Sequence, residues 1–211
     1  MTSRYGRITG LVGLGLALGA GLAQAQGNLN ARLNGDYAFS QSRSCVEVAG
    51  TLSFDPETFQ IVPPGPLTPL FLLRRFTTAD RGTIRYNGDG TGSATVVGSS
   101  IDMGSGTGFP ASQFNVTCQI AYTVNADDTV DHHADCSSTT TAGGGVGNTT
   151  TVTGIRTKRR IVQGNTAILH GPAEPPVIES VSVTVMSGPN FFPTRERICV
   201  RSGISSKLSG R

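Results

Sequence analysis

The stretch CQIAYTVNADDTVDHHADC, residues 118–136, begins and ends with cysteine and is divided by the turn-forming segment 125–128. On both sides of this segment apolar and polar residues alternate, which is the pattern of a β-strand with one buried face. If the two arms pair around the turn, Cys118 falls directly opposite Cys136, where a disulfide is geometrically accessible. The stretch therefore predicts a β-hairpin closed by its own cysteines.

The same stretch contains residue types that bind metals, including Asp131, His132, His133 and Asp135. Neighbouring residues of a strand point to opposite faces, so His132 and His133 cannot hold one ion without a bulge. We interpret His132 as a residue of a core or cavity wall and expect neither a metal site nor a cofactor. An exposed, weak site formed by His133 with Asp131 and Asp135 is the alternative.

The rest of the chain predicts an all-β fold, because Gly and Pro interrupt every window long enough for a helix. Hairpin signals, such as the Asn-Gly and Asp-Gly pairs of residues 87–90, separate further alternating segments. About nine short strands that mostly follow their sequence neighbours must close or stack, because open sheet edges promote aggregation. We predict one antiparallel, mostly meander β-barrel of about eight or nine strands. The expected strands are residues 33–45, 81–86, 91–98, 119–124, 129–136, 151–162, 165–171, 179–186 and 195–203.

Two stretches do not fit this strand pattern. Residues 55–80 are rich in proline and are expected to form a loop, with residues 70–76 as a lid over a ligand. Residues 137–149 contain mostly Gly, Ser and Thr and predict a flexible loop.

The four cysteines form an even set, which favours two disulfides in an oxidising compartment. After Cys118 and Cys136, the remaining pair is Cys45 and Cys199, which would join the first strand to the last, as barrel closure permits. Alternation, however, places Cys199 on the same face as two arginines, at positions 197 and 201. A bulge or a frayed strand end would reconcile this, and a wrong pairing would explain it equally well.

The N-terminus has the three parts of a secretory signal peptide: basic residues at 4 and 7, an apolar segment 8–23, and small residues up to Ala25. We expect residues 1–25 to be a signal peptide and residues 26–211 a single disulfide-stabilised barrel domain. The protein is then exported, to a periplasmic or extracellular location.

The charge gives no sign of a nucleic-acid partner. Without its two signal-peptide arginines the chain has a formal charge of about +1, and the basic run 156–160 contains no aromatic residue. We interpret this run as a solvated strand face. Membrane insertion is also not expected, because the thirteen Phe and Tyr residues are scattered along the chain.

Three segments, GDYAFS (35–40), RGTIRYNGDGTGSATV (81–96) and the hairpin 118–136, resemble a loose group of exported bacterial proteins of unknown function that repeat such hairpins. The resemblance covers most of residues 33–136. It implies a small calycin-type barrel, akin in shape to lipocalins, avidins and allene oxide cyclases. The chain has no Trp, so the Gly-x-Trp hallmark of lipocalins is absent, and no ligand or catalytic residue is implied.

These observations favour a binding or structural module, and small closed barrels have room for one small apolar ligand. For the inward residues themselves, ordinary core filling is favoured over ligand binding. A barrel-type cyclase or isomerase using His132 or Glu179 is the competing hypothesis, although the chain has no catalytic motif, and an outer-membrane barrel is weaker still. The expected ligand-binding wall consists of Tyr37, Phe39, Ile120, Tyr122, Val124 and His132.

Overall fold

The structure is a computed structural model, and it describes residues 29–62, 71–103, 111–162, 164, 166–171, 176–186 and 188–208. The signal peptide expected for residues 1–25 lies outside these residues. A helical turn that includes residues 29 and 30 precedes the first strand. The strands are β1 (Asn34–Gly50), β2 (Ser53–Phe54), β3 (Ile61–Val62), β4 (Phe71–Asn87), β5 (Thr91–Asp102), β6 (Ser112–Val124), β7 (Thr129–Gly143), β8 (Thr149–Val162), β9 (Ala167–His170), β10 (Glu179–Thr184) and β11 (Thr194–Lys207).

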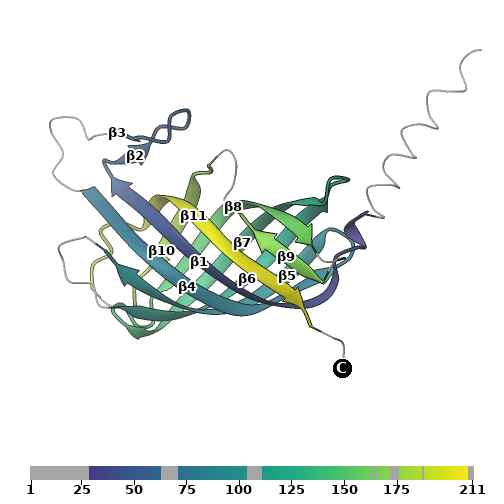
Figure 1. Cartoon of the computed structure of the whole chain (residues 1–211). Coiled ribbons are helices and arrows are strands. Elements are labelled where there is room, and N and C mark those ends of the chain that lie inside the picture. The colour runs from purple at the N-terminus through teal and green to yellow at the C-terminus, as the bar shows by residue number, and fades with distance from the viewer. Residues whose placement is uncertain are drawn as a thin grey trace, which may run out of the picture.

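Nine of these strands form one antiparallel sheet that closes on itself (Figure 1), and β2 and β3 pair separately. The ring closes where β1 pairs with β11 along twelve residues, from Tyr37 opposite Lys207 to Val48 opposite Glu196. Short strands β9 and β10 share one position of the ring, because both pair with β8 and with β11, at different heights. The predicted all-β barrel is confirmed, and all nine expected strands are present. In the residues that the structure describes, no helix has the length and apolar composition needed to cross a membrane.

Strand alternation separates an inner from an outer face along the whole ring. In the hairpin 118–136, Val124 lies opposite Val130 and Cys118 opposite Cys136, which is the register predicted from the sequence. His132 is buried inside the ring, whereas its neighbour His133 is exposed outside it. The two histidines therefore face opposite sides of the sheet, as expected.

Both loop predictions were wrong in part. Strand β4 begins at Phe71, so residues 71–76 form part of the ring wall and are not a lid, while residues 63–70 lie outside the described residues. Strand β7 continues to Gly143 and pairs with β6 and β8, which leaves only a short turn before Thr149. In residues 71–76 the inner positions are Leu72, Arg74 and Phe76 and the outer positions are Phe71, Leu73 and Arg75, so the two faces do not differ in polarity. In residues 137–143 the inner positions are polar, for example Ser138 and Thr140, so the apolar alternation that signals a strand is missing.

Both disulfides form as the sequence suggests, Cys118 to Cys136 and Cys45 to Cys199. Cys45 lies directly opposite Cys199 in the pairing of β1 with β11, without a bulge. The expected distortion is absent because Arg197 and Arg201 point into the ring, where each is only 5% exposed. Disulfides of this kind persist in oxidising environments.

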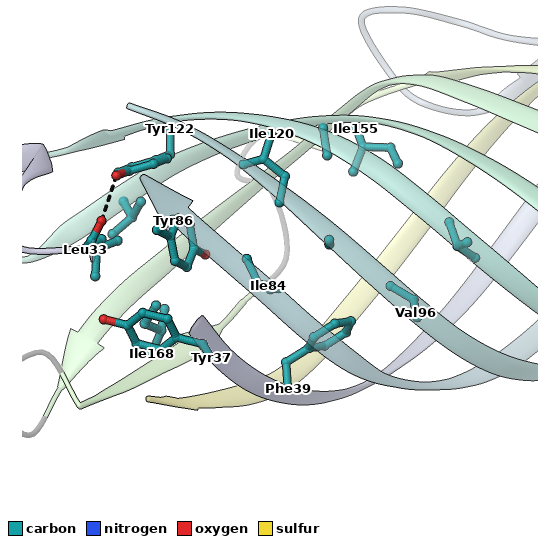
Figure 2. Close-up of a cluster of buried hydrophobic side chains, with 14 of the residues drawn as sticks. Leu33, Tyr37, Phe39, Ile84, Tyr86, Val96, Ile120, Tyr122, Ile155 and Ile168 are labelled. Atoms are coloured by element: carbon teal, nitrogen blue, oxygen red, sulfur yellow. Dashed lines mark hydrogen bonds between the residues drawn. The ribbon is translucent and has the colours of Figure 1, made fainter. Parts of the chain in front are cut away.

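One end of the barrel is closed by the segment before β1, drawn in purple in Figure 1. The hydroxyl of Tyr122 donates a hydrogen bond to the carbonyl of Leu33 at 2.8 Å and accepts one from the amide of Gly88 at 3.0 Å (Figure 2). The rings of Tyr37, Tyr86 and Tyr122 pack edge to face, with centroids 5.4 and 4.9 Å apart. We call this end the tyrosine floor.

The two disulfides should contribute unequally to stability, because they close loops of different length. Their cysteines are 154 residues apart for Cys45–Cys199 and 18 apart for Cys118–Cys136. The loop-entropy model gives about 5 and about 3 kcal/mol for loops of these lengths. We expect urea unfolding of the C45A/C199A and C118A/C136A variants to show the larger loss in the first. A larger loss in the second variant would contradict this ranking.

Candidate ligand cavity

A cavity of about 730 Å³ occupies the barrel interior and extends to the end opposite the tyrosine floor. Its middle section is apolar, and its outer section reaches the turn at 144–148 and the segment 189–192. The volume lies within the range of cavities that bind small molecules. The apolar section is lined by Phe39, Ile84, Ala94, Val96, Val116 and Ile120.

The six expected wall residues divide into two groups. Phe39, Ile120 and His132 line the cavity. Tyr37, Tyr122 and Val124 do not line the cavity and belong to the buried core. Figure 2 shows Tyr37 and Tyr122 at the tyrosine floor. Alternation correctly assigned all six to the inside of the ring, but it does not specify at which height a side chain lies.

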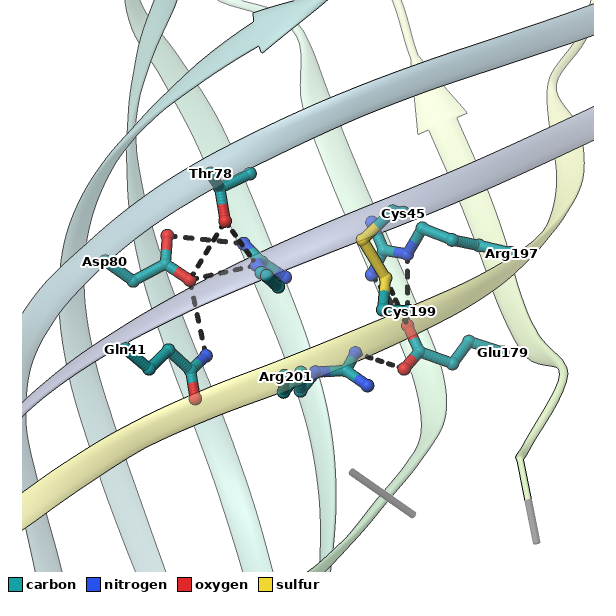
Figure 3. Close-up of a disulfide and its surroundings, with 9 residues drawn as sticks. Gln41, Cys45, Thr78, Asp80, Glu179, Arg197, Cys199 and Arg201 are labelled. Carbon is teal, nitrogen blue, oxygen red and sulfur yellow. Dashed lines mark hydrogen bonds and ion pairs between the residues drawn. A yellow bond between two sulfur atoms is a disulfide. The ribbon is translucent and has the colours of Figure 1, made fainter. Parts of the chain in front are cut away.

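The outer section of the cavity holds ion pairs that the sequence did not reveal. Glu179 accepts two hydrogen bonds from Arg197, at 2.9 and 3.0 Å, and one from Arg201 (Figure 3). The other pairs join Arg43 to Asp80 at 2.9 Å, Arg195 to Glu47 at 2.7 Å and Arg74 to Asp102 at 2.8 Å. One feature of the sequence could have predicted these ion pairs. Arg197 and Arg201 share a strand face with Cys199, and because Cys199 bonds to the inward-facing Cys45, both arginines must point inward as well.

Glu179 and Arg201 keep their charges despite burial. Burial opposes ionisation of Glu179, but the guanidinium groups of Arg201 and Arg197 outweigh it, so the pKa of this carboxyl lies below its ordinary value. For Arg201, burial lowers the pKa to about 10, against the opposing effect of Glu179. At neutral pH Glu179 and Arg201 are therefore both charged.

Arg159 lies deeper, on the apolar side of the cavity, and is 7% exposed. Its Nη1 donates a hydrogen bond to the hydroxyl of Tyr86 at 2.7 Å, and its Nε donates one to Thr157 at 3.4 Å. No carboxylate pairs with it among the described residues. The interpretation of residues 156–160 as a solvated face was thus wrong for Arg159, because alternation turns it inward while Arg156, Lys158 and Arg160 are exposed.

Two buried histidines accompany Arg159. Burial lowers the pKa of His132 well below its usual value, and burial also lowers the pKa of His170 to about 2. His170 Nε2 lies 2.6 Å from the Ser205 hydroxyl, whereas neither ring nitrogen of His132 has a hydrogen-bond partner among the described residues. Both imidazoles are therefore neutral at pH 7, and the ring nitrogens of His132 are buried within the cavity wall without a hydrogen-bond partner among the described residues.

Within the described part of the chain, no three His, Cys, Asp or Glu side chains come close enough together to hold a metal ion. Comparisons of the chain with family models, with curated proteins and with solved structures found no match. The geometry of the cavity is therefore the basis for any functional proposal.

Replacing Glu179 with Gln should destabilise the protein strongly, because it leaves two buried guanidinium groups without their carboxylate. Removal of one partner from a buried ion pair costs about 3–5 kcal/mol. The loss can be measured by urea unfolding at pH 7. As a control, Glu57→Gln alters an exposed carboxylate and should change stability by less than about 0.5 kcal/mol. Equal effects of the two substitutions would show that the cluster is solvated.

The histidines predict a loss of stability in mild acid. Their folded-state pKa values lie below that of an unfolded histidine, about 6.5, so below this pH the unfolded chain binds protons that the folded protein does not. Each histidine should lower the unfolding free energy by about 1.4 kcal/mol per pH unit between pH 6 and 5. We expect the unfolding free energy, measured by urea unfolding between pH 6 and 5, to depend on pH about half as steeply in His132→Leu as in the wild type.

The control for this measurement is Ile120→Val, which removes one methyl group from the same apolar face. It should lower stability by about 1 kcal/mol at every pH and leave the slope unchanged. A slope unaffected by His132→Leu would mean that His132 is protonated in the folded protein.

Proposed function

We propose that this protein is an exported, non-enzymatic barrel that binds a small apolar molecule in its interior. The observation that carries the proposal is the cavity of about 730 Å³ with an apolar middle section, enclosed by a closed sheet. A protein that needed its interior only for stability would gain by filling it, because empty apolar volume costs free energy. We include in this proposal that the barrel has a calycin-type shape.

Export and exposure to water are supported by two separate features. The two disulfides favour an oxidising compartment, in keeping with the signal-peptide pattern of residues 1–25. A lipid-facing barrel needs an apolar outer band, but the outer faces of β5, β6 and β7 are largely polar. Exposed residues there include Ser93, Thr95, Ser99, Asn115, Thr117, Gln119, Asp131, His133 and Asp135.

The competing enzyme hypothesis receives less support. It named His132 and Glu179 as candidate acid–base residues. Glu179 is engaged by two arginines, so its carboxylate has little freedom to act on a substrate. His132 lines the cavity, but a buried neutral histidine serves a binding site equally well.

The neutral fluorescent probe N-phenyl-1-naphthylamine should bind the purified protein at micromolar concentration. Ala94→Phe should weaken this binding by about tenfold or more, because the added ring occupies part of the cavity. Thr95→Phe adds a ring at the next position, which is exposed on the outer face, and should leave the affinity unchanged. Absence of binding, or equal effects of the two substitutions, would refute a ligand-binding interior.

A further inference from the structure

The deep end of the cavity is rich in hydrogen-bond donors and poor in acceptors. His132 on β7 and Arg159 on β8 both line the wall there, next to Tyr86 on β4. The ring centroids of Tyr86 and His132 are 6.4 Å apart, and Arg159 contacts the Tyr86 hydroxyl at 2.7 Å. The Tyr86 hydroxyl points away from Leu33 and the floor (Figure 2).

The charges at the cavity do not balance. Five of its arginines pair with four carboxylates in the outer section, and Arg197 and Arg201 share one of them. Arg159 is the cavity-lining arginine for which the described residues provide no carboxylate. Burial of a cation without a counter-charge is strongly unfavourable, so a residue of this kind is costly to keep for packing alone.

The donors around Arg159 match the needs of one carboxylate. A guanidinium group can bind a carboxylate through two parallel hydrogen bonds, and a carboxylate can accept further bonds from other donors. Arg159 donates one hydrogen bond through Nε to Thr157 and one through Nη1 to Tyr86, so Nη2 and the second N–H of Nη1 can bind a carboxylate. Tyr86 and His132 adjoin this guanidinium group but are buried in the cavity wall.

We propose that the ligand is an anionic amphiphile, whose carboxylate binds Arg159 and whose apolar chain extends along the cavity toward its outer section. This inference rests on the proposed ligand-binding function and adds the chemical class and orientation of the ligand. The apolar section between Arg159 and the outer ion pairs provides the surface for the chain. A monocarboxylate would supply the ion-pair partner that Arg159 lacks among the described residues.

The test compares decanoate with decan-1-ol, which share a chain and differ in headgroup charge. Each is titrated at pH 7.5 against protein loaded with N-phenyl-1-naphthylamine, and displacement gives the two affinities. We expect the wild-type protein to bind decanoate about tenfold or more tightly than decan-1-ol, because charge-assisted hydrogen bonds are strong. In Arg159→Met the preference should fall below about threefold, with decan-1-ol still bound.

The matched control is Arg160→Met, which removes the neighbouring arginine from the exposed outer face and should leave the preference intact. Arg159→Lys provides a second variant that keeps the charge and loses the planar fork, and it should retain an intermediate preference. Thermal unfolding gives an independent measurement: decanoate should raise the melting temperature of the wild type but not of Arg159→Met.

The outcomes separate this inference from the proposed function. If neither compound displaces the probe, or if the probe does not bind, both proposals are overturned. If both compounds bind equally to the wild type, the ligand-binding proposal stands and the carboxylate assignment is overturned. A preference for decanoate that survives in Arg159→Met also overturns the assignment, because the headgroup then binds elsewhere.

Discussion

Closure of the sheet is the constraint on which the rest of the structure depends. Twelve residue pairs join β1 to β11, so that every long strand has a hydrogen-bonded neighbour on each side. A closed sheet has no free edges, and each residue is assigned to the inside or the outside by its position along the strand. The cavity and the inward direction of Arg159, Arg197 and Arg201 all follow from this assignment.

The barrel interior divides into a dry end and a polar end. At the tyrosine floor, aromatic rings and aliphatic side chains are buried together, and the segment before β1 covers them. At the opposite end, ion pairs such as Glu179 with Arg197 replace apolar packing. Buried ion pairs stabilise a fold less well than packed apolar side chains do. This end of the barrel therefore contributes less to stability, and it contains open volume lined by polar groups.

The sequence was informative wherever the inner face is apolar, and it failed where that face is polar. The hairpin 118–136 could be predicted to the register of its pairs, because its two faces differ clearly in polarity. Residues 71–80 were assigned to a loop together with the proline-rich segment before them, and residues 137–143 were assigned to a loop because Ser and Thr on both faces remove the contrast that marks a strand. The inward position of Arg159 was also not predicted, because it lies in a run of basic residues and such a run is typical of a solvent-exposed strand face.

The closing pair of strands also determines the order in which the covalent links can form. Cys118 and Cys136 belong to one local hairpin, whereas Cys45 must await the arrival of Cys199, 154 residues later. While the chain is being synthesised, Cys45 has no partner until Cys199 is added, and its thiol can exchange with the hairpin cysteines. Early formation of the Cys118–Cys136 disulfide removes two competing thiols, so the shorter-range disulfide favours correct formation of the longer-range one.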